Sequence, residues 1–318
     1  MILVTGATGF IGGHLATAMH SRGLPIRCLV RKPGAALPGD TAWADLSTGQ
    51  GLDAALEGVD LIIHLAGATA ALRPSDFYQA NVQASEVLAR AASKRQVPRL
   101  VHVSSLAAVG PSNDGAPVAE DCDPHPLTHY GKSKLQGEKA VRAAMPSAVI
   151  VRPPVVYGPR DHGVFQMLKL LSRGFAIEIG RGGRWFSAIY VTDLVEGILA
   201  AAFAPQAAGR TYFLSHAKPV SWTELAATAA NIMSKRTRII RFSGGGAYAV
   251  GYCAEVWSRC TGNPGILSRD KVRDALANCW TCDTRRASSE LGFDARTSLG
   301  DGLAQTLAWY KEAGWLHY

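Results

Sequence analysis

The chain has 318 residues, of which 47% are hydrophobic and 18% are charged, and 33 basic against 25 acidic residues give a net charge of +8. These values are typical of a globular protein with one or two domains. The basic residues are scattered along the chain and do not gather on one helix or arm, which argues against a nucleic acid as partner.

Neither the start of the chain nor its apolar runs indicate secretion or membrane insertion. Met1 leads directly into a predicted strand without the basic segment of a signal peptide, and no apolar run is long enough to span a bilayer. The six cysteines show no framework spacing, and Cys279 and Cys282 lack a second pair, so we expect structural cysteines and no metal site. We therefore expect a protein of the cytoplasm.

Short apolar runs alternate with helical patterns in the first half of the chain. Strands are predicted at residues 2–4, 26–30, 61–64, 100–103 and 148–151, and helices at residues 10–22, 76–94 and 130–144. This alternation is typical of crossover units that build a buried parallel sheet. We predict an α/β fold, a Rossmann-type doubly wound parallel sheet, with its ligands at the carboxyl ends of the strands.

The pattern changes after Arg152, where Pro153 and Pro154 end the alternation and the later elements become shorter. We predict a first domain over residues 1–152, with contributions from about 187–216, so the two parts share chain and any single boundary is approximate. Residues 153–318 are predicted to form mainly a smaller α/β lobe for the substrate, which would bind in the cleft between the two parts.

Gly6, Gly9 and Gly12 follow the first predicted strand and open the first predicted helix. Glycine lets the backbone come close to a pyrophosphate, and the N-terminus of the helix then points its free N–H groups at that ligand. We therefore predict a dinucleotide site in this turn.

The second predicted strand is followed by Arg31 and Lys32. NAD sites usually have an acidic residue here for the ribose 2′-hydroxyl, whereas Arg31 can hold a 2′-phosphate with two parallel hydrogen bonds. The alternative is that Arg31 is only an exposed residue at the end of a strand. We predict a preference for NADP(H), with NAD(H) as the alternative. Asp45 and Leu46, after a short third strand, either fix the adenine or form a surface turn.

Ser104 and Ser105 follow the strand at 100–103, and Tyr130 and Lys134 lie on one face of a predicted helix. A serine hydroxyl can donate to a substrate oxygen as negative charge develops there, although it can also simply cap a turn. A tyrosine titrates near ~10, and we expect Lys134 and an oxidised nicotinamide to lower that pKa so that the phenol can transfer a proton. Lys134 can also hold the ribose of the nicotinamide.

Together these motifs resemble the extended short-chain dehydrogenase/reductase family, the NAD-dependent epimerase/dehydratase-like group. The resemblance also includes residues 64–67, 152–159, 189–193 and 282–293, so that it covers nearly the whole chain. It implies that Ser105, Tyr130 and Lys134 are catalytic. The cofactor contacts that we predict are Gly6, Thr8, Gly9, Phe10, Ile11, Gly12, Arg31, Lys32, Asp45, Leu46, Leu65, Ala66, Gly67, Ser104, Tyr130, Lys134, Pro153, Val155 and Val156.

Departures from the motifs of the family narrow the range of reactions and substrates that we expect. Leu106 and Ala107 stand where sugar-nucleotide dehydratases have an Asp-Glu pair, so the acid and base for eliminating water are missing. Phe186, with Trp185 beside it, stands where nucleotide-sugar members place an arginine for the diphosphate, and Arg184 is close but displaced. An aromatic residue at this place indicates an apolar substrate.

The segment at 104–111 is more similar to 3β-hydroxysteroid dehydrogenases and dihydroflavonol reductases than to sugar epimerases. For the stretch at 247–257, which is apolar on most faces, a membrane surface or a substrate pocket are alternatives, but we predict a buried helix because a basic face is absent. The predicted substrate contacts are Leu106, Tyr157, His162, Phe165, Trp185 and Phe186, with a surface position as the alternative for His162 and Phe165.

These residues predict an NADP(H)-dependent oxidoreductase that interconverts a ketone and a secondary alcohol on a mostly apolar substrate, such as a steroid, a flavonoid or a lipid. One alternative is a nucleotide-sugar 4-epimerase that keeps its NAD tightly bound. The other is a non-catalytic, dinucleotide-sensing protein on the same fold. The expected partner is a small molecule, and a homodimer is the default oligomeric state.

Overall fold

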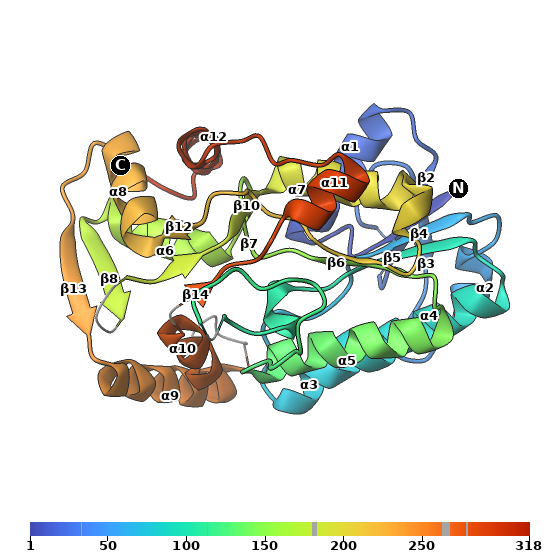
Figure 1. The fold of residues 1–318 in the computed structure, drawn as a ribbon, viewed down its shortest axis with the longest axis horizontal. Coiled ribbons are helices and arrows are strands. Elements are labelled where there is room, and N and C mark those ends of the chain that lie inside the picture. Colours follow the sequence, from blue (N-terminus) through green and yellow to red (C-terminus); the bar gives the residue numbers. More distant parts are fainter. Residues whose placement is uncertain (33, 113, 180–182, 263–267, 278) are drawn as a thin grey trace.

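A seven-stranded parallel sheet organises the structure, which is a computed structural model that describes residues 1–32, 34–112, 114–179, 183–262, 268–277 and 279–318 (Figure 1). The strand order is β11-β6-β5-β4-β1-β2-β3, and every neighbouring pair is parallel. The strands are β1 (Ile2–Thr5), β2 (Ile26–Val30), β3 (Asp40–Trp43), β4 (Leu61–His64), β5 (Arg99–Val103), β6 (Val149–Arg152) and β11 (Thr211–Phe213).

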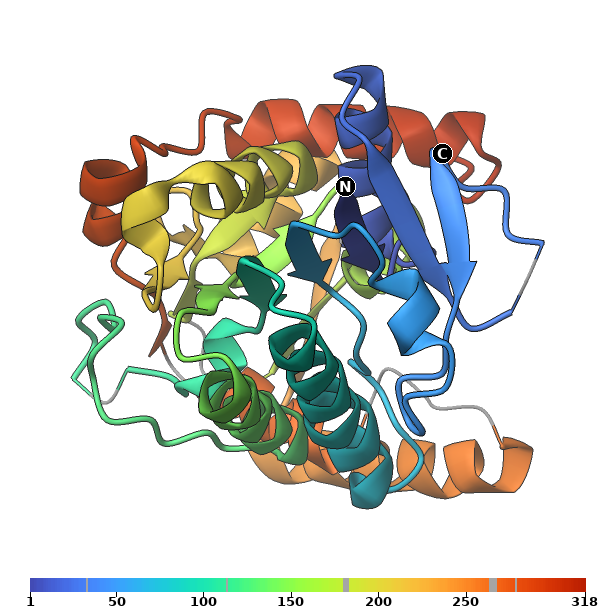
Figure 2. The ribbon, with the colours of Figure 1, turned by 90° about the vertical axis from the view of Figure 1, so that its right-hand side faces the viewer.

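Helices cover both faces of this sheet, as Figure 2 shows from its side. All strands but the edge strand β3 are largely buried, so their side chains divide between two apolar cores. One core includes α1 (Phe10–Ser21) and α7 (Val191–Phe203), and the other includes α4 (Ala84–Lys94) and α5 (His129–Ala144). The predicted Rossmann-type α/β fold is confirmed.

The helix predicted at 76–94 differs from the observed backbone. The chain forms α3 (Pro74–Tyr78), one π-helical turn at Gln79–Gln83, and then α4. The π turn carries the buried Asn81, whose side chain is hydrogen-bonded to two other segments, as described below. Such turns insert one residue into a helix and are frequent at functional sites.

A third core joins most of the elements after Arg152, and we call the elements around it the C-terminal lobe. The division of the chain into two domains stays a prediction, although β11 belongs to the large sheet and α7 packs on one face of it. The remaining elements are α2 (Leu52–Ala55), β7 (Val155–Tyr157), α6 (Gly163–Ser172), β8 (Phe175–Ile179), β9 (Trp185–Phe186), β10 (Ala188–Tyr190), β12 (Val220–Ser221), α8 (Trp222–Ile232), β13 (Arg238–Phe242), α9 (Gly244–Thr261), α10 (Arg269–Leu276), β14 (Cys279–Trp280), α11 (Arg285–Leu291) and α12 (Leu299–Glu312).

The stretch at 247–257 lies within α9, and the prediction that it is a buried helix is wrong. Val250, Tyr252, Val256 and Trp257 are all exposed, and the last of these shows 71% of its surface. The helix packs through small residues instead, because Ala247 and Gly251 are the buried positions among its described side chains. In the part of the chain that the structure describes, none of the helices combines the length and apolar character needed to cross a bilayer.

Candidate active site

The glycine turn lies between β1 and α1. Gly6 has a φ of +74°, and a Cβ on it would lie 2.8 Å from the backbone nitrogen of Ala66 after β4. A Cβ on Gly12 would collide with the carbonyl oxygen of Gly6, and the N–H of Gly9 donates to that same oxygen at 2.9 Å. Only glycine therefore permits this tight turn, which leaves the N-terminus of α1 open at the carboxyl edge of the sheet.

A cavity of about 300 Å³ adjoins this turn. Arg160, which the sequence analysis missed, reaches it from the segment after β7, and its Nη1 lies 2.9 Å from where a Cβ on Gly13 would be. A guanidinium beside the start of α1 suits an anionic ligand. The lining residues are Thr8, Gly9, Phe10, Arg160, His162, Trp309 and Trp315.

The end of β2 presents two exposed cations, Arg31 and Lys32. Asp45 follows β3, and its carboxylate accepts from the N–H of Ser47 at 2.8 Å and from the hydroxyl of the same residue at 2.7 Å. These bonds, with a smaller contribution from the charge of Arg31, lower the pKa of Asp45. Leu46 is buried beside it. The geometry is that of a turn, and contacts of these residues with an adenine or a 2′-phosphate stay predictions.

Ser105, Tyr130 and Lys134 come together at the carboxyl end of β5. Ser105 caps a short 3₁₀ turn by accepting from the N–H of Ala107 at 3.1 Å, and its side chain lies close enough to the phenol of Tyr130 to lower the pKa of that group. Gly131 makes this approach possible, because a Cβ there would collide with the carbonyl oxygen of Ala107. Lys134 is buried, and its Nζ donates to the carbonyl oxygen of Val103 at 2.8 Å.

The protonation of the cluster differs from the expectation. Burial raises the pKa of Tyr130 above its usual 10, while the side chain of Ser105 opposes the rise and the charge of Asp274 adds to it. The phenol of the protein alone is therefore protonated at neutral pH and can act as a proton donor. Burial also lowers the pKa of Lys134 to about 8, and the nearby Glu138 opposes that change.

Helix α10 forms a wall of the site that the sequence analysis missed. Lys271 places its Nζ 5.2 Å from the centre of the Tyr130 ring, and Phe77 lies on that ring with 6.0 Å between centroids. Asp274 has a buried Oδ1 for which the described residues offer no hydrogen-bond partner, and burial raises its pKa to about 6. A carboxyl group in this state suits a hydrogen-bonding group on a ligand.

Two contacts fix α10 to the start of α5. The N–H of His129 donates to Asp270 Oδ2 at 3.0 Å, and Arg273 Nη1 donates to the carbonyl oxygen of Leu127 at 3.3 Å. These contacts join residues more than 140 positions apart, so no local pattern could have revealed them.

Asn81 in the π turn supports the floor of the site. Its Oδ1 accepts from the N–H of Ala68 at 2.8 Å, and its Nδ2 donates to Ser133 Oγ at 2.9 Å. Because Ala68 follows the predicted cofactor residues Leu65, Ala66 and Gly67, this amide ties that loop to the helix that carries Tyr130 and Lys134.

Two histidines lie fully buried under the site on neighbouring strands. His64 hydrogen-bonds with Thr5 Oγ1 at 2.7 Å and with Ser85 Oγ at 2.9 Å. Its ring centroid lies 5.2 Å from that of His102, whose two nitrogens have no partner among the described residues. Burial, with the charge of Lys134, lowers the pKa of His64 to about 3 and also lowers that of His102.

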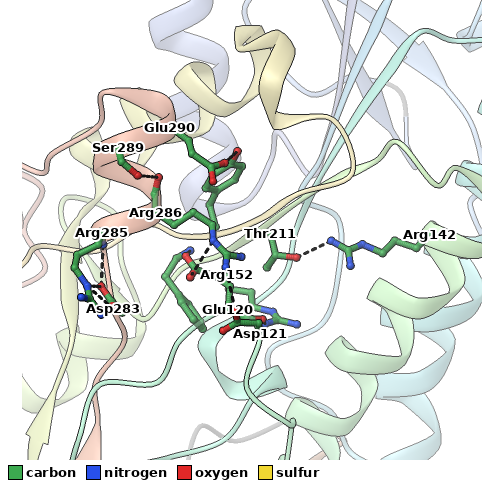
Figure 3. Close-up of polar contacts among 12 residues, drawn as sticks. Glu120, Asp121, Arg142, Arg152, Thr211, Asp283, Arg285, Arg286, Ser289 and Glu290 are labelled. Carbon is green, nitrogen blue, oxygen red and sulfur yellow. Dashed lines mark hydrogen bonds and ion pairs between the residues drawn. The ribbon is translucent and has the colours of Figure 1, made fainter.

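A buried ion pair holds α5 against β6. Arg152 donates from Nε to Glu138 Oε1 at 2.9 Å and from Nη2 to Oε2 at 2.7 Å. Arg152 also donates from Nη1 to the carbonyl oxygen of Glu120 at 3.3 Å, and the carboxylate of Glu120 lies 3.6 Å from Arg286 of α11 (Figure 3). These contacts connect the helix of the catalytic cluster to the C-terminal part of the chain.

The predicted substrate residues occupy several environments. Leu106 is buried beside the catalytic turn, and Phe186 is buried against Trp222 with 4.4 Å between ring centroids, whereas Trp185 is exposed. Tyr157 lines a cavity of about 370 Å³ in the C-terminal lobe together with Ala188, His216, Lys218, Val220, Glu224, Thr228, Thr297, Ser298, Leu299 and Gly300.

His162 and Phe165 both pack against Trp315, with ring centroids 4.5 and 5.1 Å away. His162 thereby lines the cavity beside the glycine turn, and Phe165 belongs to the core of the C-terminal lobe. Substrate contact by any of these predicted residues stays a prediction.

The residues at the carboxyl edge fit a nicotinamide dinucleotide. The glycine turn forms a cradle that any Cβ would fill, and Ser104 has a buried Oγ for which the described residues offer no partner. Pro153, Val155 and Val156 follow β6 on the same side of the sheet, with the carbonyl oxygen of Pro153 accepting from Leu106 at 2.9 Å. A dinucleotide between the turn and Ser104 would reach Tyr130 and Lys134.

A glycine turn after the first strand of such a sheet, with a Ser-Tyr-Lys cluster at the neighbouring strands, defines a class of nicotinamide-dependent enzymes. Residues 2–214 match the model of the NAD dependent epimerase/dehydratase family, and the chain belongs to this family. The resemblance to the extended short-chain dehydrogenase/reductases is thus confirmed.

Relatives in this family include a reductase and an epimerase. The chain is 32% identical over 321 residues to ceramide reductase of Caulobacter vibrioides, a match that covers 99% of this chain and 96% of that protein. It is 29% identical over 317 residues to N-acetyl-alpha-D-glucosaminyl-diphospho-ditrans,octacis-undecaprenol 4-epimerase of Escherichia coli O157:H7, covering 96% and 94%.

Among solved structures, MoeE5 in complex with UDP-glucose and NAD superposes with a TM-score of 0.80 at 26% identity, covering 98% of this chain and 99% of that one. The family depends on nicotinamide dinucleotides, and these relatives are enzymes.

Proposed function

We propose that this chain is an NADP(H)-dependent oxidoreductase that interconverts a ketone and a secondary alcohol on a mostly apolar, lipid-like substrate. The observation that carries the proposal is the grouping of Ser105, Tyr130 and the buried Lys134 at the carboxyl edge of the sheet that also carries the glycine turn. The bound nicotinamide would supply or accept the hydride at the carbinol carbon.

The protonated phenol of Tyr130 gives its proton to the substrate oxygen in the reducing direction. Ser105 donates to the same oxygen and orients it, since its side chain is close enough to the phenol to influence the pKa of Tyr130. Lys134 is held by the carbonyl oxygen of Val103, and with a pKa of about 8 it is mostly charged at neutral pH. Its charge stabilises the phenolate that the proton transfer leaves behind.

The preference for NADP(H) is supported by the two exposed cations that follow β2, Arg31 and Lys32. A 2′-phosphate would place two negative charges beside them, whereas a free 2′-hydroxyl would leave them without a partner from the cofactor.

The apolar character of the substrate is supported by two aromatic residues. Phe77 flanks Tyr130, and in the C-terminal lobe Phe186 is buried against Trp222 at the place where nucleotide-sugar members have an arginine. The Caulobacter relative, named ceramide reductase, makes a ketone derived from ceramide the first candidate substrate.

A second candidate is a sugar 4-epimerase with tightly bound NAD. One observation favours it, because Arg184 has a buried Nε for which the described residues provide no acceptor. A diphosphate could be that acceptor, and the relative from Escherichia coli is such an epimerase.

The two candidates are separated by a panel of substrates with purified protein. We expect NADPH oxidation with a ketone derived from ceramide or with a steroid ketone, and none with UDP-, GDP- or dTDP-sugars. The Phe186→Arg variant is a matched probe of the substrate site. It should weaken the binding of the apolar ketone and leave the binding of NADPH unchanged. NAD that survives purification, together with micromolar binding of a nucleotide sugar beside Arg184, would instead establish the epimerase.

A further inference from the structure

One end of the C-terminal lobe is unusually apolar on its outside. It is formed by α9 and by the two-stranded sheet of β8 and β13, which lie next to each other at the lower left of Figure 1. Thirteen large hydrophobic side chains are exposed among the described residues, and eight of them are in these elements. Seven of the eight form the surface that we call the apolar end face, and the eighth, Ile239, lies on the other face of the small sheet. The members of the apolar end face are Phe175, Ile177, Ile240, Val250, Tyr252, Val256 and Trp257.

Helix α9 exposes its large apolar side chains, whereas an amphipathic helix usually buries them. The positions exposed on one face recur with helical spacing, and most of their side chains are apolar. The opposite side is built from small residues, because a Cβ on Gly251 would already lie 3.1 Å from Val272 of α10. The exposed face comprises Ala249, Val250, Cys253, Val256, Trp257 and Cys260.

The small sheet shows the same arrangement. In its parallel register Ile240 pairs with Ile177, so both side chains lie on one face together with the alternate residue Phe175. All three are exposed. The other face is covered only in part. Ala176 packs against the lobe core, whereas Ile239 is exposed and Arg241 forms an ion pair with Glu178 at 2.8 Å.

Basic residues border these apolar side chains. Residues 235–241 contain Lys235, Arg236, Arg238 and Arg241 and have no acidic residue, and all four are exposed. Among the described residues, this segment forms one ion pair, between Arg241 and Glu178. The other three cations are therefore available to an anionic surface.

The apolar end face lies one helix away from the catalytic cluster. On one side of α10, the Arg269 guanidinium stacks over Tyr252 of α9 at 5.2 Å. On the other side, Lys271 lies over the ring of Tyr130, also at 5.2 Å. A lipid that left a bilayer at α9 would have only the width of α10 to cross before it reached the phenol.

We propose that the apolar end face docks on a bilayer that contains anionic lipids, with α9 lying in the plane of the interface. Aliphatic side chains would enter the acyl boundary, Tyr252 and Trp257 would lie at the level of the headgroups, and Lys235, Arg236 and Arg238 would face the lipid phosphates. This inference rests on the proposed function in one respect, which is that the substrate is a lipid delivered from that bilayer.

The same charges argue against a second copy of the chain as the occupant. A two-fold contact through this face would bring the same surface of both copies together, and with it the cations of residues 235–238. Like charges at such a contact repel each other, whereas anionic headgroups would neutralise them.

The test is co-sedimentation of the full chain with vesicles of phosphatidylcholine alone or mixed with phosphatidylglycerol. We expect tighter binding to the mixed vesicles, and weaker binding as salt is raised. The Val256→Ser/Trp257→Ser variant should lose about tenfold or more in affinity for both, and Arg236→Gln/Arg238→Gln should lose about tenfold only for the mixed vesicles.

Phe203→Ser is the matched control, because Phe203 is 53% exposed at the end of α7 on the large sheet and should not touch the bilayer. Circular dichroism checks that each variant is folded. Quenching of Trp257 by brominated lipid chains, read as the difference from Trp257→Phe, locates the residue in the interface independently of affinity.

The proposal is wrong if the wild type does not bind either vesicle, or if the Val256→Ser/Trp257→Ser variant binds as the control does. A dimer in solution that this variant converts to a monomer, without vesicle binding, would assign the face to a second copy. Reduction of a ketone in detergent micelles is measured in parallel. Ketone reduction without vesicle binding would refute only the docking proposal. Vesicle binding without ketone reduction would refute only the proposed function.

Discussion

The buried ion pair between Arg152 and Glu138 should stabilise the fold only as long as both partners are present. Their side chains are 7% and 6% exposed, and two parallel hydrogen bonds of 2.9 and 2.7 Å join them. Glu138→Met leaves a guanidinium buried without its carboxylate, and Arg152→Met leaves the carboxylate buried. Each change should cost about 3–5 kcal/mol of unfolding free energy, the usual penalty for one uncompensated charge of a buried pair.

The residual contacts set where in this range each variant falls. Without Glu138, the Arg152 guanidinium keeps the carbonyl oxygen of Glu120 at 3.3 Å and the ring of Phe213 at 5.8 Å, so we expect the cost to be near about 3 kcal/mol. The double variant Glu138→Met/Arg152→Met removes both charges and fills the space with apolar atoms. It should therefore be more stable than either single variant.

Guanidinium denaturation of the four proteins, followed by circular dichroism and by tryptophan fluorescence, measures this double-mutant cycle. The expected coupling between the two sites is about 3 kcal/mol or more. If the two single costs simply add in the double variant, or if each stays below about 1 kcal/mol, the pair does not hold α5 against β6 in the way described.

Three further predictions concern the cofactor, the chemistry and acid stability. Tyr130→Phe should lower turnover by about 10²–10⁴-fold while NADPH affinity, measured by calorimetry, stays nearly unchanged; turnover like that of the wild type would contradict the proton-transfer role. Arg31→Asp should weaken NADPH by about 1.5–3 kcal/mol and improve NADH relative to it, and equal binding of both nucleotides by the native protein would make Arg31 a mere surface residue. The unfolding free energy should fall as the pH drops from about 6.5 toward 3. In this range His64 and His102 become protonated in the unfolded chain but stay neutral in the native state, where burial lowers the pKa of each. For His64 alone the loss at about pH 5 is about 2 kcal/mol, so urea midpoints that do not change between about pH 8 and 5 in the wild type, or that change equally in His64→Gln, would refute this assignment.

Most of the sheet could be predicted from the sequence because all of its strands but β3 are largely buried. Strands at 26–30 and 61–64 appear with the predicted bounds, since a mostly apolar run between turn signals is typical of a buried strand. The glycine turn could also be predicted, because Gly6 has a φ of +74° and a Cβ on Gly12 would collide with the carbonyl oxygen of Gly6. These constraints act between residues that are close in the sequence.

The rest depends on contacts that no local pattern contains. The π turn around Asn81 arises from hydrogen bonds to Ala68 and Ser133, so the sequence alone predicted an uninterrupted helix. The position of Asp274 next to Tyr130 depends on how α10 docks on α5. In the protein without cofactor, the pKa of Tyr130 is raised, whereas the sequence analysis expected it to be lowered. Burial outweighs the other influences on the phenol, and the sequence alone does not reveal burial.

Because β11 and α7 come late in the chain, the large sheet stays incomplete for part of the time that the chain is being synthesised. The strand pairs with β6, which ends at Arg152, and α7 covers one face of the sheet, yet both are made after residue 190. A ribosome that adds about 5–20 residues each second needs several seconds to travel from β6 to Phe213. During that interval the nascent chain carries an open strand edge and an uncovered apolar face, which are the features that promote aggregation. A chaperone at the ribosome would have its strongest binding surface on this chain in those seconds.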